Sequence, residues 1–247
     1  MQISPIKTRV FKEGEDIVSF ITAHIPKLKN GSILAITSKI VALAEGRVVK
    51  IKNRKEKERL IRAESEWRLK VLPEWWLTVR DGTVVVNAGL DDSNADGKTI
   101  LLPEDSFKSA DEIRKKLKKK YGIKKLGVVI TDSRTSALRE GVTGVALGYA
   151  GFKGVKDYRG KSDIFGRKLK VTKTNLADSL ATSATTVMGE GNEQRPLAII
   201  EDAPVEFCEK VNRKELRIKM KYDMYRSLFA RGNKIKGSPC FSKGTFY

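Results

Sequence analysis

Histidine and cysteine are scarce in this 247-residue chain, which has one His and two Cys. His24 lies in an amphipathic stretch between Glu15 and Pro26, and we expect it to be a surface or packing residue. A Ser-His-Asp triad would have to use it, and no G-x-S-x-G elbow accompanies it. Cys208 and Cys240 have no metal-ligand spacing, which excludes zinc clusters and argues against a disulfide framework. Any chemistry must therefore use carboxylates, hydroxyls, lysines, backbone amides and a hard metal ion.

Long apolar runs and the common phosphate-binding motifs are also missing. No apolar run is long enough to span a bilayer, and Met1 to Pro5 do not form a signal peptide. Neither G-x-x-x-x-G-K-[ST] nor G-x-G-x-x-G occurs, so neither a P-loop nor a Rossmann interpretation has support. We expect a cytoplasmic protein with no membrane partner.

Acidic residues are outnumbered: 30 Asp and Glu against 49 Lys and Arg give a formal net charge of +19. This excess favours anionic partners such as nucleotides, nucleic acid, phosphorylated metabolites or acidic membranes, but a general bias toward Lys explains it equally well. The hydrophobic fraction of 40% is enough for a core. We expect one domain over residues 1–230 and a basic, flexible tail over 231–247.

The pattern of apolar residues predicts a mixed architecture. Trp76–Arg80, Asp81-Gly82 and Thr83–Val86 predict a hairpin, because Asp-Gly suits the two-residue turn. A capping-box pattern at Ser109–Glu112 predicts a helix that ends near Gly122. Further strands are predicted at 2–6, 32–37, 47–51, 126–131, 142–150 and 197–200, and further helices at 15–25, 40–44, 55–70, 176–188 and 215–229. The irregular alternation predicts an α+β fold with a mixed sheet, hairpins and packed helices.

Three segments end in hard oxygen ligands. The apolar run from Gly127 leads into Asp132 and Ser133, Val84–Leu90 leads into Asp91, and the predicted helix ending at Met188 leads into Glu190. If these ends converge, the carboxylates repel one another, and a divalent cation removes the conflict. Mg²⁺ prefers a few carboxylates together with water and substrate phosphates. The alternative is that each acid is an ordinary cap or turn residue.

Several further motifs follow one another along the chain in a fixed order. They are Ala44-Glu45-Gly46, Val86–Asn94, Ile130–Ser133, Arg139–Gly144, Asp157–Gly160, Asp163–Arg167 and Met188–Gly191. With these motifs the chain resembles the γ-glutamyl ligases that extend the tail of the deazaflavin coenzyme F-420, a family that includes folate-metabolism γ-glutamate ligases. The resemblance runs from about residue 7 to residue 200.

The resemblance implies a homodimeric amide ligase that depends on GTP and on Mg²⁺ or Mn²⁺. It implies that Asp91 and Asp132 bind one metal ion, and that Glu190 binds a second together with Ser133, where the family has Thr. It also implies nucleotide contacts, while no catalytic residue is assigned. The implied contacts are Ser38, Asn94 and the 188–195 loop with Met188, Gly189, Gly191, Asn192 and Arg195, with Thr8–Phe11 as a weaker match.

Two departures from the family pattern concern positive charge. Leu43 stands where the family has a Lys before the A-E-G motif, and Ser38-Lys39 stands where it has Ser-Thr. Lys39 is therefore a candidate to replace the missing cation at the nucleotide.

The function implied is the addition of L-glutamate to the carboxylate of a small anionic acceptor, a deazaflavin or a folate-like molecule, through an acyl phosphate, with the choice between GTP and ATP left open. A related ligase that uses another amino acid or acceptor is a close alternative. A nucleic-acid-binding protein with a lapsed active site is an alternative, motivated by the basic stretch 115–125 and the tail. A metal-dependent phosphoester hydrolase is a third possibility. Glutamate-dependent nucleotide consumption separates the ligase from both.

Overall fold

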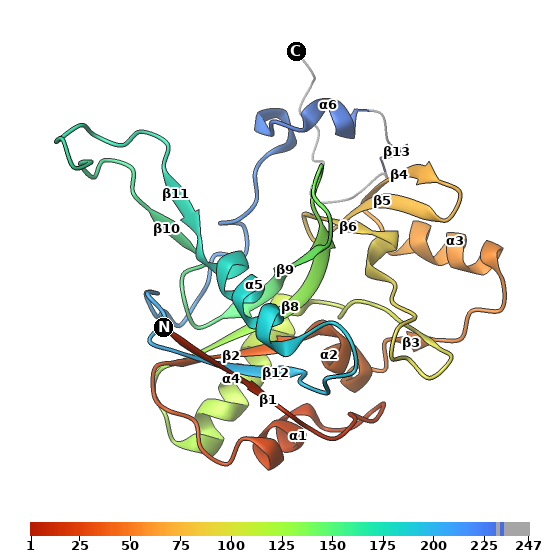
Figure 1. Cartoon of the computed structure of the whole chain (residues 1–247), viewed down its shortest axis with the longest axis horizontal. Helices are drawn as coiled ribbons and strands as arrows, with labels where there is room; N and C mark the ends of the chain where they lie inside the picture. The colour runs from red at the N-terminus through yellow and green to blue at the C-terminus, as the bar shows by residue number, and fades with distance from the viewer. Residues whose placement is uncertain (231–232, 235–247) are drawn as a thin grey trace.

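The computed structural model describes residues 1–230 and 233–234, and its centre is a five-stranded mixed sheet (Figure 1). Strands β2 and β8 run parallel, and the other neighbouring strands run antiparallel. The predicted α+β fold is thus confirmed. In spatial order the strands are β1 (Gln2–Ile6), β12 (Leu197–Glu201), β2 (Ser32–Thr37), β8 (Leu126–Thr135) and β9 (Val142–Ala150).

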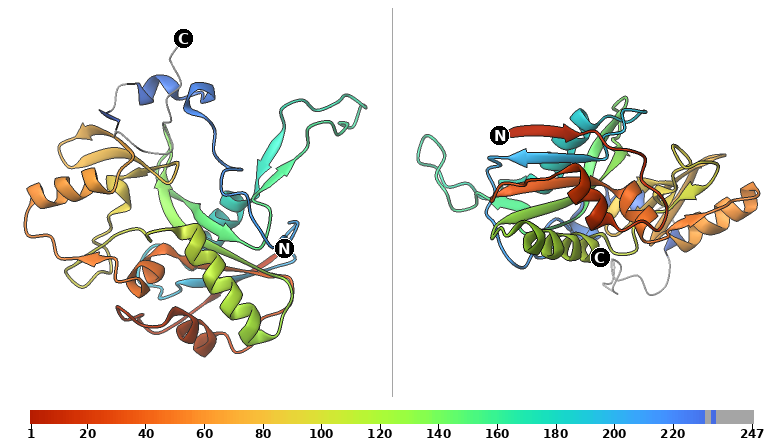
Figure 2. Two further views of the ribbon diagram at one scale, coloured as in Figure 1. Left: turned by 180° about the vertical axis from the view of Figure 1, so that it is seen from behind. Right: turned by 90° about the horizontal axis from the view of Figure 1, so that it is seen from below.

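Helices cover both faces of this sheet. Alternate residues of β2 point to opposite faces, so Leu34 and Ile36 join one core cluster while Ile33 and Ala35 join the other. The first cluster contains α1 (Ile17–His24), α2 (Ser38–Ala44) and α4 (Ser106–Tyr121), and the second contains α5 (Leu176–Met188). Figure 2 shows α4 and α5 on opposite sides of the sheet. Burial on both faces explains why β2 and β8 begin as continuous apolar runs.

Helix α5 lies directly on β9, and this contact fixes where its C-terminal end points. A Cβ on Gly144 would come 2.2 Å from Thr185 Oγ1 and 2.7 Å from the carbonyl oxygen of Ala181. Only glycine permits this approach. The helix ends at Met188, as predicted, and Gly189 follows with φ of +83°. The chain then turns back over the carboxyl end of β8.

A second, smaller sheet lies beside the central sheet. It has the order β13-β4-β5-β6, with β13 (Asn233–Lys234), β4 (Trp67–Leu72), β5 (Trp75–Arg80) and β6 (Thr83–Val86). The predicted hairpin is confirmed, since Asp81 and Gly82 have φ of 52° and 74°. The 3₁₀ turn η1 (Asn87–Gly89) then carries the chain toward Asp91, and β3 (Val48–Val49) pairs with β7 (Thr99–Ile100) beside it.

The predicted helix over 55–70 is wrong in its second half. Helix α3 spans only Arg54–Ala63, and Trp67 lies in strand β4. The tryptophan is fully buried, packs against Val79 and Phe229, and donates its indole N–H to the Phe229 carbonyl at 2.9 Å. Tertiary burial of this ring, together with pairing to β5, outweighs the helical spacing of the charged stretch.

Two other helix predictions need correction. The N-cap of α4 is Asp105, whose carboxylate accepts the Lys108 N–H at 2.9 Å, so the helix starts three residues before the predicted capping box at 109–112. Its C-cap Gly122 is left-handed, as predicted. The stretch 215–229 forms only η2 (Met220–Tyr222) and α6 (Arg226–Phe229), because Glu215 turns inward and accepts hydrogen bonds from Tyr149 and Gly154.

A hairpin of β10 (Val155–Asp157) and β11 (Lys173–Asn175) projects from the body of the protein (Figure 1). Within the described ranges, no helix is both long and apolar enough to cross a bilayer. The predicted flexible tail over 231–247 lies outside the described residues, apart from 233–234. His24 is a packing residue, as expected, with its ring centroid 4.5 Å from that of Phe20.

Candidate active site

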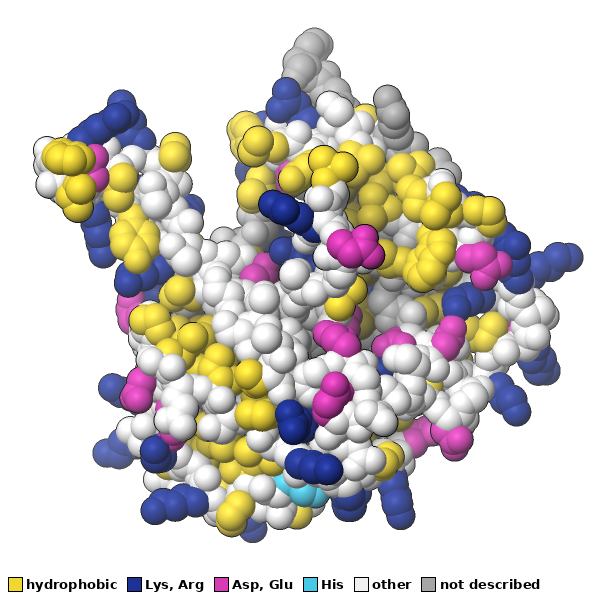
Figure 3. All heavy atoms as spheres, viewed as in Figure 1, with side chains coloured by type: hydrophobic (Ala, Val, Ile, Leu, Met, Phe, Trp, Pro, Cys, Tyr) yellow, Lys and Arg dark blue, Asp and Glu magenta, His cyan; other side chains and the backbone are white. Residues whose placement is uncertain are grey.

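A cavity of about 630 Å³ opens between the carboxyl ends of β2 and β8 and the β5–β6 hairpin. Its lining includes the loop after β1, the first turn of α2, the segment after η1, and the loop after α5. Acidic side chains gather near the centre of the face shown in Figure 3. The cavity therefore joins segments that are far apart in the sequence, including all three that carry the predicted oxygen ligands.

Asp91 lies at the edge of this cavity on an irregular segment. Its backbone exchanges two hydrogen bonds with Ile100, which fixes its position. One carboxylate oxygen accepts the Ser93 N–H at 2.7 Å, and the other accepts the ammonium of Lys39 at 2.9 Å. Partial burial raises the pKa of Asp91, but the hydrogen bonds from Lys39 and Ser93 outweigh burial and leave the pKa below its ordinary value. Asp91 is thus held ionised.

Asp132 lies deeper and in a different setting. The sequence places it after a strand, but β8 continues through it to Thr135, with a register shift between Ile130 and Thr131. Ser38 donates to Asp132 through its hydroxyl at a distance of 3.3 Å. Burial raises the pKa of Asp132 to about 7, and the negative charge of Asp91 contributes to the rise. Without a cation, this carboxylate is partly protonated at neutral pH.

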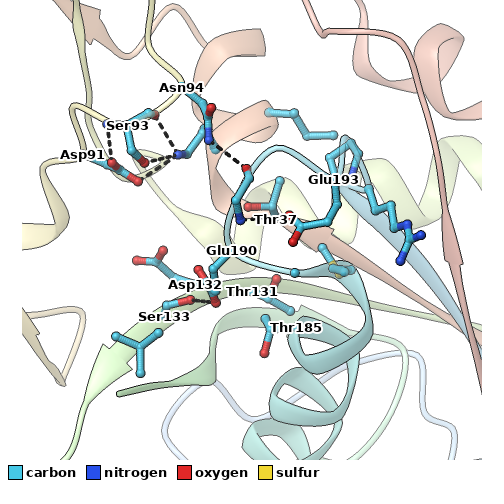
Figure 4. A pocket seen from close by; sticks show the side chains of 18 of the residues that line it. Thr37, Asp91, Ser93, Asn94, Thr131, Asp132, Ser133, Thr185, Glu190 and Glu193 are labelled. Atoms are coloured by element: carbon cyan, nitrogen blue, oxygen red, sulfur yellow. Dashed lines mark hydrogen bonds and ion pairs between the residues drawn. The ribbon is translucent and has the colours of Figure 1, made fainter. Parts of the chain in front are cut away.

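Ser133 and Glu190 form a second pair of oxygen donors. The Ser133 hydroxyl donates to Glu190 Oε1 at 2.5 Å (Figure 4). Glu190 comes from the loop after α5, and the left-handed Gly189 turns that loop toward β8. The two residues are 57 positions apart in the sequence and meet only because α5 packs on β9.

The loop over 188–196 closes one side of the cavity. Asn94 donates through its amide to the carbonyl oxygen of Gly191 at 3.2 Å, which ties this loop to the Asp91 segment (Figure 4). The backbone N–H of Thr8 donates to Gln194 at 2.9 Å and brings the Thr8–Phe11 stretch alongside. The predicted nucleotide contacts that line the cavity are Lys39, Asn94, Met188, Gly189, Gly191, Asn192 and Arg195.

Ser38 differs from the other predicted nucleotide contacts. It is buried, it is not among the residues that line the cavity, and its hydroxyl is directed to Asp132. In this structure Ser38 binds the Asp132 carboxylate and does not face the cavity. Asp92 likewise points away, to Lys57 at 2.6 Å and Thr99 at 2.5 Å, and it does not line the cavity.

The described acidic side chains of the cavity do not form one compact cluster, and a hydrogen bond directly joins two of the predicted oxygen donors, Ser133 and Glu190. Among the described residues, no three His, Cys, Asp or Glu side chains come together closely enough to hold one ion. Asp91 with Asp132, and Ser133 with Glu190, would instead supply two oxygen-bearing side chains per ion. Mg²⁺ commonly takes one or two carboxylates and completes its shell with water and substrate phosphates. The donor set fits hard divalent ions that complete their coordination with water or ligand oxygens.

Several residues that line the cavity were not among the predicted site residues, and Ser93, Glu193 and Trp75 are examples. Glu193 fills the space where a Gly189 side chain would project and accepts the Gly191 N–H at 2.8 Å. No local pattern marks such a role. Trp75 adjoins the buried Trp76, and strand alternation could have singled it out as the outward-facing residue of the pair.

Comparison with known proteins places these residues in context. The family described as F420-0:Gamma-glutamyl ligase matches residues 5–202. The coenzyme F420:L-glutamate ligase of Methanopyrus kandleri is 37% identical over 219 residues, 81% of this chain and 86% of that protein. The protein with the same name from Methanococcus maripaludis strain C6 is 38% identical over 215 residues, 87% and 86% of the two chains. That from Methanocaldococcus jannaschii is 33% identical over 245 residues, 92% and 97%.

Proposed function

The chain belongs to the F420-0:gamma-glutamyl ligase family, whose members form amide bonds, and we propose that it joins L-glutamate to the carboxylate of a deazaflavin or folate-like acceptor with GTP as co-substrate. We place this reaction in the cytoplasm. The observation that carries the proposal is the meeting of Asp91, Asp132 and the Ser133–Glu190 pair in one cavity. These oxygens lie beside the loop that we assign to the nucleotide.

Two divalent ions, Mg²⁺ or Mn²⁺, would be held by these side chains. Asp91 and Asp132 would bind one ion, and Ser133 and Glu190 the other. When bound, such ions neutralise the charge on the transferring phosphoryl group and on the leaving group. The protein's own contribution is positioning: the carboxylates sit on β8 and on the segment fixed to Ile100, so little movement is needed when the ions arrive.

The nucleotide phosphates would lie between the acids and the loop over 188–195. Arg195 and Lys39 line the cavity and supply positive charge for phosphate oxygens. The glycines at 189 and 191 let the backbone approach a ligand closely. Asn94 bridges the loop and the Asp91 segment, so it is in position to contact the nucleotide and to hold the two walls together.

The proposed reaction has two steps, phosphoryl transfer and amide formation. An oxygen of the acceptor carboxylate attacks the γ-phosphorus of GTP, the bond to the bridging oxygen breaks, and GDP leaves. The α-amine of glutamate then attacks the acyl phosphate carbon, phosphate leaves, and the proton lost by the amine passes to the departing phosphate or to water as the amide forms. Alignment of three substrates and stabilisation of phosphate charge provide most of the catalysis, so no histidine is required.

The acceptor would bind against the apolar wall of the cavity. Trp75, Val85, Val86, Leu90 and Val142 line that wall, and the side chain of Trp75 is 53% exposed. A flat aromatic ring system such as a deazaflavin or a pterin stacks well on an indole. This placement leaves the acceptor's carboxylate near the acids and therefore near the γ-phosphate.

We also propose that the protein acts as a homodimer through the β10–β11 hairpin. Near the tip of the hairpin, Ile164, Phe165 and Val171 are 91%, 89% and 84% exposed. Large apolar side chains gathered on a projecting arm favour a protein contact. Light scattering should give a dimer mass for the wild type and a lower mass for the double variant Ile164→Ser, Phe165→Ser; equal masses would exclude the hairpin contact.

The test of the proposed function is nucleotide turnover with defined substrates. GDP and phosphate should form only when L-glutamate and a deazaflavin or folate acceptor are both present, and mass spectrometry should show the acceptor extended by glutamate. Phosphate release that ignores glutamate would point to a hydrolase instead. Absence of turnover, together with RNA affinity that falls steeply with salt, would favour the nucleic-acid alternative.

A further inference from the structure

The ammonium of Lys39 is fully occupied inside the acidic part of the cavity. Its Nζ lies 2.9 Å from Asp91 Oδ2, 2.9 Å from the Ser93 carbonyl oxygen and 3.0 Å from the Ser93 hydroxyl. An ammonium group has three N–H donors, so these contacts use all of them. The side chain is 22% exposed. The Lys39 ammonium is thus held in place by three oxygen atoms.

One of these three oxygens belongs to Asp91, which we assign to a divalent ion together with Asp132. With Lys39 on Oδ2 and the Ser93 N–H on Oδ1, both oxygens of the Asp91 carboxylate are engaged. A divalent ion bound to Asp91 would lie close to the ammonium, where the two positive charges repel each other. This repulsion disfavours the binding of both the lysine and the ion to Asp91 at once.

We propose that Lys39 is an internal counter-ion that competes with a divalent ion for Asp91, and that ion binding moves its ammonium toward the nucleotide phosphates. The inference rests on the proposed function of the same cavity. Before the ion arrives, Lys39 occupies Asp91 and links it to Ser93. Afterwards the same charge is free to bind a phosphate oxygen, so one side chain serves both states.

The surroundings of Lys39 allow this movement. Lys39 is in the first turn of α2, and Leu43, one turn later on the same helix face, also lines the cavity. Leu43 carries no charge, so nothing on that face opposes the displaced ammonium. The four-carbon side chain of lysine is flexible enough to reorient while its backbone stays in the helix.

A neighbouring ion pair provides a matched control. Lys57 contacts Asp92 at 2.6 Å, one residue along from Asp91, but that carboxylate points away from the cavity to Thr99. Removing Lys57 therefore deletes a positive charge near the same segment but leaves the Lys39–Asp91 ion pair intact. A difference between the two lysine variants isolates direct competition from a general loss of positive charge.

The experiment is titration of the nucleotide-free protein with Mn²⁺, followed by electron paramagnetic resonance of the unbound ion. Lys39→Met should bind Mn²⁺ about five- to tenfold more tightly than wild type, because an ion pair of about 1 kcal/mol no longer blocks Asp91. Lys39→Arg, which keeps the cation, and Lys57→Met should stay within about twofold of wild type. In an Asp91→Asn background, Lys39→Met should have no effect. Circular dichroism checks that each variant is folded.

Unchanged or weaker Mn²⁺ binding by Lys39→Met would overturn the inference, as would an equal gain in Lys57→Met. The ligation assay separates this failure from failure of the proposed function. If the wild type ligates glutamate but Lys39→Met gains no Mn²⁺ affinity, only the competition is refuted. If Mn²⁺ affinity rises as expected but no acceptor is ever extended, the competition stands and the ligase assignment falls.

Discussion

Asp91 and Asp132 face the same cavity, yet their surroundings shift their pKa values in opposite directions. Asp91 lies at the rim with 43% of its side chain exposed and is held ionised by Lys39 and Ser93. Asp132 lies lower, with one serine hydroxyl as its side-chain partner among the described contacts, and burial raises its pKa to about 7. Under our proposal, a cation that binds both carboxylates displaces an ammonium from Asp91 and, at and below about pH 7, a proton from Asp132.

The difference shows how a cavity can hold acids close together without a metal ion. If both carboxylates were ionised and unpaired, their repulsion would destabilise the fold. Here one charge is balanced by a lysine and the other is partly removed by protonation. The two acids are neutralised by different means, and each means can be tested separately.

The largest expected effect is on activity. Asp91→Asn and Asp132→Asn should each lower the rate of glutamate ligation by about 10³-fold, because each removes a charge required to hold cation and phosphate. The matched control is Asp92→Asn, which changes the neighbouring carboxylate outside the cavity. Steady-state GDP release measures all three. Equal loss in Asp92→Asn would mean that folding of the segment, and not the site, is responsible.

The two acids should also affect stability in opposite directions. The folded-state pKa of Asp132 is raised above the ordinary 3.8, so this group favours folding at low pH and loses that contribution as pH rises from about 4 to 7. Asp132→Asn should therefore stabilise the metal-free protein by about 1–3 kcal/mol at pH 8. Urea denaturation across pH 4–8 measures the change.

Asp91 provides the contrast in the same experiment. Its folded-state pKa is lowered, so its contribution is present above the unfolded pKa and is lost as pH falls through the folded value. Asp91→Asn should destabilise the protein at pH 7 and have less effect near pH 3. The same sign for both variants at pH 8 would contradict the contrast between the two acids.

Ion binding should release protons from one acid only. At pH 6, Mn²⁺ should displace up to one proton from Asp132, and at pH 9 almost none. Calorimetry in buffers with different ionisation enthalpies counts the protons. Asp132→Asn should show no release at either pH, while Asp92→Asn should behave like the wild type. Proton release that persists in Asp132→Asn would assign the titrating group elsewhere.

The smallest effect is expected at the apolar wall of the cavity, which should contribute to acceptor binding and not to metal or phosphate binding. Trp75→Ala should raise KM for the acceptor by about five- to tenfold through lost stacking, with KM for GTP unchanged. Leu72→Ala is the control, since Leu72 is 59% exposed in the adjacent strand and does not line the cavity. A rise in KM for GTP in Trp75→Ala would place the nucleotide base on this wall.

Much of the fold was predictable because its signals are local. The apolar runs of β2 and β9, the Asp81-Gly82 turn and the end of α5 at Met188 all appear where the sequence places them. The failures have tertiary causes. Trp67 leaves its helical pattern to become buried beside Phe229, and Glu215 leaves its helical pattern to bind Tyr149.

The candidate site also has a part that was predictable from the sequence and a part that was not. Residue type and position at segment ends indicated that Asp91, Asp132, Ser133 and Glu190 would share one site if those ends converge, and all four line one cavity. The environment of each acid was not predictable, because it depends on contacts between distant residues. Ser38 lies 94 positions from Asp132, and the Lys39 contact to Ser93 spans 54 positions. No local pattern reports which carboxylate receives a lysine and which receives a proton.

The most direct test of the account is a crystal structure of the protein with Mn²⁺ and a non-hydrolysable GTP analogue. We predict anomalous peaks for Mn²⁺ at about 2.0–2.3 Å from oxygens of Asp91 and Asp132 and of Ser133 and Glu190, each ion also touching the terminal phosphates. Lys39 should have left Asp91 for a phosphate oxygen. Manganese bound outside the cavity, or phosphates that contact none of these acids, would contradict the account.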